Sequence, residues 1–380
     1  MHSRWRHFDT FPIDSELPDN SPLPSRITDL LKEWQTQSEP VSLQEGVRRL
    51  LDLFVVSVLL DAGAGDSWQF KSAQDGLFNR SEGLAMASLD YFKSGGFSSD
   101  PDCPFQCDAE GLKQINKEKL GKAFQVSETN PLVGVEGRCL LLQRLGQVCQ
   151  KYPKYFGHEN PRPGNILDYI VKHPQSELSG EQYTVPISTL WEIVIQGFSE
   201  VWPDSRTKLF GVSVGDVWPC EAMEKIAAET QKNPSDDSKL VVFHKLSQWL
   251  TYSLMEPLSL FGIRFSGTEV LTGLAEYRNG GLFVDFGVLQ LKESHMPKED
   301  DVPRFHVHDQ VIVEWRALTV ALLDIVGERV RSKLNMTESG LPLVKVLEAG
   351  TWKAGREIAR KLRPKTRGPP IEIISDGTVF

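Results

Sequence analysis

The residues best suited to chemistry gather in one short stretch of the chain. Residues 268–292 read TEVLTGLAEYRNGGLFVDFGVLQLK, which brings the carboxylates of Glu276 and Asp285 close to the pair Tyr277 and Arg278. Carboxylates move protons or stabilise a developing cation, and arginine binds oxyanions through charge-assisted hydrogen bonds. The stretch therefore suits a phosphorylated small molecule and either acid–base or cation-stabilising chemistry.

Further charges lie inside two apolar helices predicted on either side of this stretch. In the predicted helix 239–255, Lys245 falls within a broad apolar arc, so its ammonium either extends to solvent or meets an anion in a pocket. The predicted helix 310–330 has almost no polar side, yet it contains Glu314 and Arg316. Because buried charges are normally paired, these two could form an ion pair that orders the core or could support the site.

Local patterns predict how the central stretch is held. Apolar residues at helical spacing predict a helix over 268–277, and Asn279-Gly280-Gly281 can end it because these residues tolerate positive φ. Residues 282–291 alternate like a β-hairpin. We therefore expect Glu276, Tyr277 and Arg278 on the last turn of a helix, and Asp285 on the strand that follows.

A second feature is the loop after an apolar helix. Ser42 and Glu45 form a capping box, and the helix that they open is apolar all round through Leu60, which predicts burial. The helix ends in Asp61-Ala62-Gly63-Ala64-Gly65. Such a loop could let backbone approach a ligand, or it could simply cap the helix. The loop is not a nucleotide-binding P-loop, because no Gly-Lys-Ser/Thr follows it.

The whole chain predicts a mainly α protein. We expect roughly ten helices with short β-hairpins, including one over 371–380, and neither regular βα alternation nor a repeat. Residues 1–25 are rich in aromatics and prolines and are expected to form an N-terminal arm. Residues 26–380 are expected to form a single compact, multi-helix catalytic domain.

Composition narrows the classes of partner. The 380 residues carry a net charge of −9, which disfavours general binding to nucleic acid or to an anionic membrane. The five cysteines form no CxxC pair and are expected to be free thiols, so we expect a cytoplasmic protein. His306 and His308 could bind a metal from one face of a strand, although a surface or helix-capping role is the alternative.

Longer motifs resemble a known family. The chain is similar, over nearly its whole length, to the uracil-catabolism protein four family, a family built on a domain of unknown function. The similar segments are SRWRHFD, LDLFVVSVLLDAGAG, RSEGLAMASLDYFKSGGFSSDP, NPLVGVEGR, RPGNILDY, FHKLSQWLTYSL, LTGLAEYRNGGLFVDFGVLQLK, VIVEWRA, LEAGTWKAGREIA and GPPIEIISDGTVF. Other members carry a further segment before the element that SRWRHFD matches, and this chain begins almost at that element.

A more distant resemblance suggests a reaction. The queuosine-salvage nucleotide N-glycosidases are all-α proteins that resemble DNA glycosylases. Their Tyr-Lys-Arg-Ala-Gln helix is similar to residues 244–248, and their Leu-Thr-x-x-Ala-Asp-Tyr-Arg segment is similar to residues 271–278, with Glu276 in place of the aspartate. Their Glu-x-x-Ile-Arg helix is matched in a departing form by residues 314–316. The resemblance implies a DNA-glycosylase-like fold.

Together these resemblances imply hydrolysis of the N-glycosidic bond of a ribosylurea 5′-phosphate, giving urea and ribose 5-phosphate without a metal or other cofactor. The implied catalytic residues are Glu276 and Asp285. The implied substrate-binding residues are Lys245, Gln248, Tyr277, Arg278, Arg316 and Trp68, with Trp68 and the Gly63–Gly65 loop closing the pocket.

Two alternatives stay open. One is a metal-dependent amidohydrolase acting on a ring-opened uridine nucleotide, with His306 and His308 as candidate ligands. The other is a non-catalytic partner that passes a labile intermediate between uracil-catabolism enzymes. Neither nucleic acid nor a membrane is expected as a partner. Association with other uracil-catabolism enzymes is compatible with the hydrolase and with both alternatives.

Overall fold

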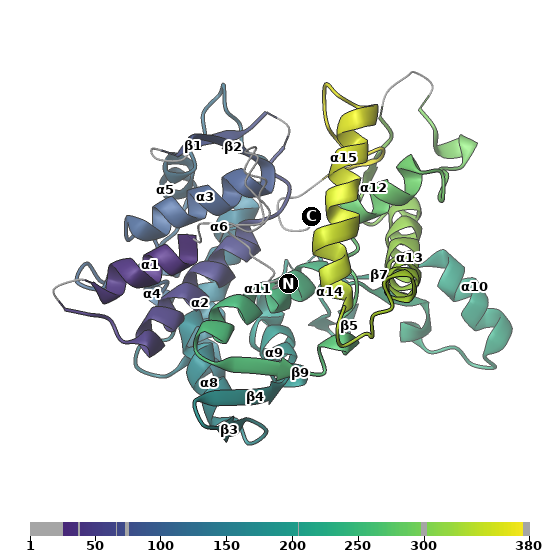
Figure 1. The fold of residues 1–380 in the computed structure, drawn as a ribbon. Coiled ribbons are helices and arrows are strands. Elements are labelled where there is room, and N and C mark those ends of the chain that lie inside the picture. The colour runs from purple at the N-terminus through teal and green to yellow at the C-terminus, as the bar shows by residue number, and fades with distance from the viewer. Residues whose placement is uncertain are drawn as a thin grey trace.

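The protein is mainly helical, as its sequence predicts (Figure 1). The computed structural model describes residues 26–36, 39–65, 67–72, 76–203, 205–297 and 302–374. The predicted N-terminal arm and the turn of the predicted C-terminal hairpin lie outside these residues. Within them, no helix is both long and apolar enough to cross a membrane.

Helix α2 (Leu43–Leu60) forms the centre of the main core. Its Val, Leu and Phe side chains are buried on every side, as the sequence predicts. The Ser42 side chain accepts a hydrogen bond from the Glu45 backbone N–H, which confirms the predicted cap. The helices that surround α2 are α1 (Arg26–Gln35), α3 (Arg80–Lys93), α6 (Val135–Lys151), α8 (Ile166–Lys172) and α11 (Lys245–Leu260).

Shorter helices complete this part of the molecule, and most of them pack on α6 or α8. They are α4 (Ala109–Lys113), α5 (Lys117–Ala123), α7 (Pro153–Phe156), η1 (Pro163–Asn165), α9 (Ile187–Glu192), η2 (Ile193–Gly197) and η3 (Ser199–Val201).

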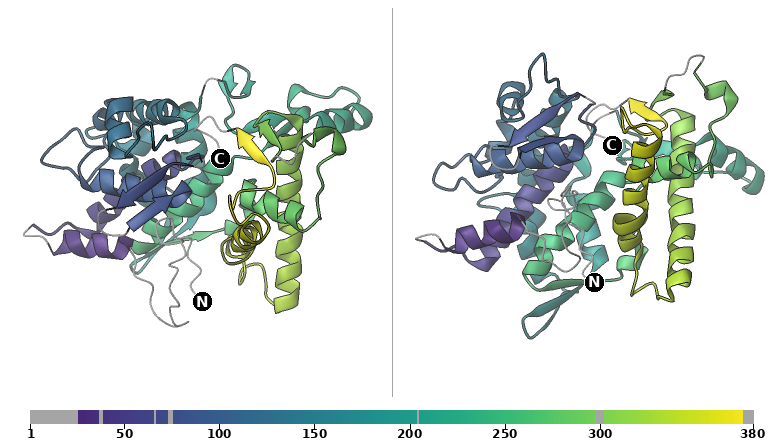
Figure 2. Two further views of the ribbon diagram at one scale, coloured as in Figure 1. Left: turned by 90° about the horizontal axis from the view of Figure 1, so that it is seen from above. Right: turned by 45° about the horizontal axis from the view of Figure 1, so that its top comes forward.

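The C-terminal helices stand beside this core rather than around it. Figure 2 shows them on the opposite side of the molecule from α1 and α3 in two further directions. They are α12 (Tyr277–Asp285), the long α13 (Gln310–Leu334), α14 (Leu343–Val346), the π-helix η7 (Leu347–Trp352) and α15 (Lys353–Leu362). Helix α10 (Glu221–Thr230) lies at the periphery and buries only Ala227. The short 3-10 helices η4 (Asp236–Lys239), η5 (Thr268–Val270) and η6 (Glu293–His295) lie in connecting segments.

The strands make small sheets of two or three members. Strands β1 (Gln69–Ser72) and β2 (Gly76–Asn79) form a hairpin, and so do β5 (Lys208–Leu209) and β6 (Val212–Ser213). The others are β3 (Glu177–Ser179) with β4 (Gln182–Pro186) and β9 (Ile263–Ser266), β7 (Val217–Pro219) with β8 (Leu240–Val242), and β10 (Arg304–His306) with β11 (Glu372–Ile374). Because β10 and β11 run parallel, residues 372–374 pair with a strand that is distant in the sequence.

The local prediction for residues 268–292 is wrong. Within the predicted helix 268–277, only the short η5 (Thr268–Val270) is helical, and the helix α12 begins at Tyr277. Glu276, Tyr277 and Arg278 therefore begin a helix instead of ending one, and Asp285 is the last residue of α12 instead of a strand residue. The reason is that the Glu276 carboxylate accepts the backbone N–H groups of Arg278 and Asn279, which fixes the start of the helix there.

The two glycines expected to end a helix lie within α12 because the helix packs closely on its neighbours. A Cβ atom at Gly280 would come 2.8 Å from Trp315 Cε2 and 2.9 Å from Thr319 Oγ1, both on α13. A Cβ atom at Gly281 would come 3.0 Å from Cδ of Pro370. Tertiary packing here outweighs the low helix propensity of glycine.

Candidate functional site

A cavity of about 230 Å³ lies where the main core meets the C-terminal helices. The elements that reach it are the end of α2, the starts of α3, α11 and α12, and the segment that leads into β11. It is lined by Asp61, Gly63, Ala64, Gly65, Arg80, Ser81, Leu84, Val133, Lys245, Trp249, Glu276, Tyr277, Trp352, Pro369, Glu372 and Ile373. Lys245, Glu276 and Tyr277 therefore meet in one place.

A larger hollow of about 630 Å³ lies near Gln106 and Asn160. It is mostly polar at its rim and contains none of the residues predicted to act on a substrate. The smaller cavity is the better candidate because it brings a buried lysine, Lys245, together with buried carboxylates, whereas no lysine or arginine among the described residues lines the larger hollow.

Glu276 caps helix α12. Its Oε2 accepts the Arg278 N–H and its Oε1 accepts the Asn279 N–H, both at 2.7 Å. Only 6% of the residue is exposed. Burial raises the pKa of the Glu276 carboxyl above its usual range, while the two backbone N–H groups and the charges of Lys245 and Arg278 oppose that rise.

Lys245 begins helix α11 and is 7% exposed. Its Nζ lies 5.1 Å from the centre of the Trp249 ring. In the part of the chain that the structure describes, the ammonium has no carboxylate within ion-pair distance, although its charge lowers the pKa of both Asp61 and Glu276. Lys245 therefore does not extend to solvent, and it lines the cavity.

Asp61 is one of the lining residues that the sequence prediction missed. It follows the last residue of α2, and 6% of it is exposed. Burial raises the pKa of its carboxyl; the Lys245 charge, the Ser81 hydroxyl, and the Arg138 and Arg356 charges oppose that effect. The signal that could have found it is an acidic residue placed directly after a helix that is apolar on all sides, because such a residue must lie next to the core.

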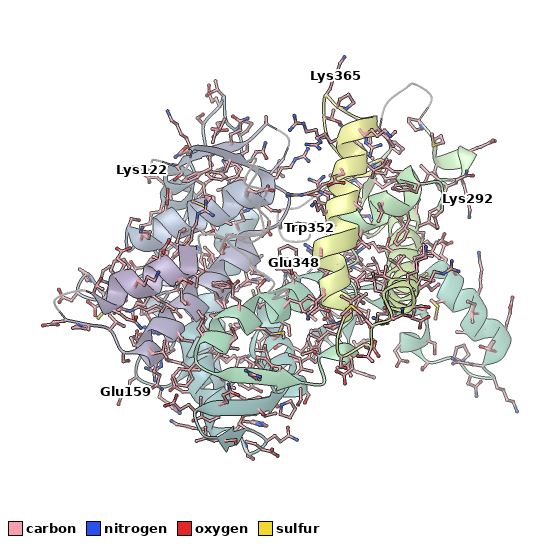
Figure 3. The ribbon with its side chains drawn as sticks, in the orientation of Figure 1. Lys122, Glu159, Lys292, Glu348, Trp352 and Lys365 are labelled. Carbon is pink, nitrogen blue, oxygen red and sulfur yellow. The ribbon has the colours of Figure 1, made fainter. Side chains whose placement is uncertain are left out.

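Aromatic side chains form the wall opposite the carboxylates. The Trp249 and Trp352 rings meet edge to face with centroids 5.9 Å apart, and Tyr277 lines the cavity beside them. Figure 3 shows Trp352 on the side of the C-terminal helices that faces the main core. These rings provide a flat, mostly apolar surface suited to a sugar.

One buried ion pair supports both Lys245 and Glu276. Asp216 accepts hydrogen bonds from Nη1 and Nη2 of Arg316, at 2.8 and 2.7 Å, and from the Lys245 backbone N–H at 3.0 Å. Arg316 Nε donates to the carbonyl of Ala275, next to Glu276. Arg316 therefore supports the site from below instead of lining it, and its partner is Asp216 rather than the nearby Glu314.

Contacts across the cavity join α3 to the C-terminal helices. The guanidinium of Arg80 donates to the carbonyls of Thr366 and Arg367, at 3.1 and 3.3 Å. Arg356 pairs with Glu82. The start of α3 is thus held to α15 and to the segment that follows α15.

The other predicted site residues do not line the cavity. Asp285 makes a two-point ion pair with Arg363, at 2.8 and 2.5 Å. Trp68 is fully buried and its Nε1 donates to the Phe124 carbonyl, so it is a core residue rather than a lid, whereas Gly63 and Gly65 do line the cavity.

Gln248 and Arg278 are buried beside the site without lining its cavity. Gln248 lies one turn after Lys245 on α11, and no hydrogen-bond partner for its buried Oε1 occurs among the described residues. The guanidinium carbon of Arg278 lies 5.0 Å from the centre of the Tyr277 ring. Arg278 therefore acts on the site through its charge and its backbone N–H, both of which reach Glu276.

The histidines considered as metal ligands lie outside the cavity. His306 is exposed on β10, and the rings of His306 and His308 stack 5.4 Å apart. Across the residues that the structure describes, no group of three or more His, Cys, Asp or Glu side chains could hold a metal ion.

Comparison with known proteins gives a family. The model of a family described as "Protein of unknown function (DUF1688)" matches residues 1–380. The chain belongs to this family. It is 39% identical over 394 residues to the protein named uracil catabolism protein 4 of Lachancea kluyveri, and 42% identical over 384 residues to the protein named urg3 of Schizosaccharomyces pombe. Each alignment covers 100% of this chain and 84% of the relative.

Proposed function

We propose that this protein hydrolyses the N-glycosidic bond of a ribosylurea 5′-phosphate and releases urea and ribose 5-phosphate. A place in uracil breakdown is supported by the name of the Lachancea relative, which aligns over the full chain. The observation that carries the reaction is a buried lysine, Lys245, that lines one cavity with the carboxylates of Asp61 and Glu276 and whose charge acts on both, next to aromatic rings.

Breaking an N-glycosidic bond gives the sugar an oxocarbenium character, so the transition state carries positive charge at C1′. An ionised carboxylate in a cavity closed to bulk water stabilises such a charge far better than water does. Glu276 is suited to this role because the start of α12 fixes its carboxylate through two backbone N–H groups. The same carboxylate can accept a proton from the attacking water.

Lys245 and the aromatic wall are suited to binding the substrate. The Lys245 ammonium is a charge-assisted donor for a ribose or phosphate oxygen, and it is not committed to an ion pair with any described residue. Tyr277 and Trp352 offer flat faces against which the ribose can pack. The cavity of about 230 Å³ suits a single small molecule better than a nucleotide within a polymer.

The relation to the queuosine-salvage nucleosidases is part of this proposal. It is supported by the mainly helical fold and by the meeting of Lys245, Glu276 and Tyr277 in one cavity. A DNA-glycosylase-like arrangement of the helices is proposed with it.

The test is urea release from synthetic ribosylurea 5′-phosphate by the purified full chain. We expect release by the wild type and its loss, by about a hundredfold or more, in Glu276→Gln. The matched control is Glu269→Gln, an exposed carboxylate on η5 in the same segment, which should keep wild-type turnover. Glutamine retains one of the two capping interactions, so the cost in stability should be about 1 kcal/mol, measured by urea unfolding.

Two outcomes would overturn the proposal. If the folded wild type releases no urea, the substrate is wrong. If Glu276→Gln turns over at the wild-type rate, the role of Glu276 is wrong even though the reaction stands.

A further inference from the structure

Three carboxylates line the cavity, and Glu372 among them pairs with Arg304. The other two sit at opposite ends of helices. Glu276 lies at the N-terminus of α12, and Asp61 follows the C-terminus of α2. From this geometry we propose that Asp61 donates the proton to the leaving urea nitrogen, while Glu276 acts as the ionised partner. This assignment rests on the reaction proposed above and adds a second catalytic residue to it.

The hydrogen bonds and charges around Glu276 favour its anion, and they act against the burial that raises the pKa of its carboxyl. The N-terminus of a helix carries a partial positive charge, and each carboxylate oxygen of Glu276 accepts one backbone N–H of α12. Lys245 and Arg278 add full positive charges nearby. A carboxylate held in this way accepts hydrogen bonds through both oxygens, so a proton on it would cost at least one of them.

The surroundings of Asp61 favour its protonated form. The C-terminus of a helix carries a partial negative charge, and the Asp61 backbone N–H is used within α2, where it donates to the Val58 carbonyl. Within the described residues, no backbone N–H donates to the Asp61 carboxylate, in contrast to Glu276. Burial is the largest influence on the pKa of this carboxyl and raises it.

The cations that face Asp61 are engaged elsewhere or shared. Arg138 donates to the carbonyls of Leu60 and Gly63, at 3.3 and 3.2 Å. Arg356 pairs with Glu82, and Lys245 divides its charge between the two carboxylates. Together with the Ser81 hydroxyl, these groups lower the pKa of Asp61 only partly.

The reaction needs such a donor because the urea anion is too strong a base to leave unprotonated. As the bond between C1′ and nitrogen breaks, its electron pair goes to nitrogen and the Asp61 proton joins it, which completes urea. The water oxygen bonds to C1′, and its proton passes to Glu276. Transfer of that proton from Glu276 to Asp61 then restores both carboxyl groups, so the sum is substrate and water to urea and ribose 5-phosphate.

A substrate whose leaving group needs no proton isolates this role. We would compare ribosylurea 5′-phosphate with 4-nitrophenyl riboside 5-phosphate, whose nitrophenolate leaves readily as an anion. Asp61→Asn should lose about 10²- to 10⁴-fold on the urea substrate and less than about tenfold on the nitrophenyl substrate. Glu276→Gln should lose activity on both, because it stabilises the cation in either reaction. Asp29→Asn, an exposed acid on α1, is the control and should match the wild type.

The pH profile gives an independent readout. With the urea substrate, wild-type kcat/KM should fall at low pH as Glu276 becomes protonated and at high pH as Asp61 loses its proton. Because the two carboxylates share Lys245, these limbs belong to the pair rather than to single residues. The high-pH limb should be absent for the nitrophenyl substrate.

The outcomes separate this assignment from the proposed function. Urea release by the wild type together with equal losses on both substrates in Asp61→Asn would overturn the proton-donor role while leaving the reaction intact. Unchanged urea release in Asp61→Asn would overturn it as well. Nitrophenolate release by the wild type without any urea release would overturn both the natural substrate and the proton-donor role, while leaving a ribosyl hydrolase.

Discussion

The ion pair between Asp216 and Arg316 offers the sharpest test of how the cavity is held together. Both side chains are buried, and they join β7 to α13 beneath the site. Asp216 also accepts the Trp218 indole N–H at 2.7 Å and the Lys245 backbone N–H at 3.0 Å. Replacing Arg316 by Met would leave a buried carboxylate without its counter-charge.

The expected cost follows from that uncompensated charge. Removing one partner of a buried pair typically costs about 3–5 kcal/mol, since the remaining ion is neither solvated nor neutralised. Arg316→Met and Asp216→Asn should each fall near this range at pH 7. The double variant should cost less than the sum of the two, by about 0.5–3 kcal/mol, because each single change already removes the same interaction.

Urea unfolding followed by circular dichroism and tryptophan fluorescence measures these costs at pH 7. The pH matters because burial alone would raise the pKa of Asp216, but Arg316 and the other donors bring it below its usual range. A lowered pKa contributes stability above the pKa of the unfolded chain, near 4, and loses it as the pH falls. The stability difference between wild type and Asp216→Asn should therefore shrink in acid.

The rate of urea release is a second measurement on the same variants. Because Arg316 holds the carbonyl of Ala275 and Asp216 holds the start of α11, both Glu276 and Lys245 should shift when the pair is broken. Single-variant costs below about 1 kcal/mol, additive with each other, would refute the reasoning. So would wild-type turnover in a folded Arg316→Met protein.

Two further predictions concern packing and burial away from the cavity. Gly280→Ala should cost about 1–3 kcal/mol because its Cβ would meet Trp315 at 2.8 Å, whereas Gly121→Ala on α5, with its nearest neighbour at 3.9 Å, should be neutral or stabilising; equal unfolding midpoints would contradict this. Asp52 is buried on α2, and burial raises the pKa of its carboxyl to about 7, from 3.8. The Asp52 carboxyl therefore contributes most to stability below pH 4, and its contribution declines as the pH rises towards 7. In urea unfolding, the free energy of unfolding of the wild type should fall by about 1.4 kcal/mol per pH unit relative to Asp52→Asn between pH 5 and 7. A relative gain for the wild type over that interval would contradict the assignment.

The helices with strong apolar periodicity were predictable from sequence. The buried α2 carries its burial pattern in the chain itself, and the capping box at Ser42 marks where α2 begins. Helix α13 was predictable as a helix, but its apolar pattern did not show which face is buried, because Leu318 and Ile325 are exposed. The meeting of Lys245, Glu276 and Tyr277 in one cavity was predictable only through family resemblance, because periodicity places a residue on its own element and not on another.

The stretch around Glu276 shows where local reasoning fails. Its two glycines favour a helix end, and the alternation after them favours strands. In the structure both glycines lie inside a helix, because only glycine allows α12 to pack so closely on α13 and Pro370. Asp285 forms an ion pair with Arg363, and this pairing could not be predicted from the residues near Asp285 in the sequence.

The sequence by itself determined that this chain is mainly helical and that α2 is buried, because composition and periodicity act within single elements. It also showed that the charged residues of the chain suit a small anionic substrate. Only the tertiary structure decided which charges meet. It brought Asp61 into the same cavity as Glu276 and paired Arg316 with Asp216, which lies 100 residues away in sequence. Long-range electrostatics and close packing depend on how elements are placed relative to one another, and that placement is set by the fold as a whole.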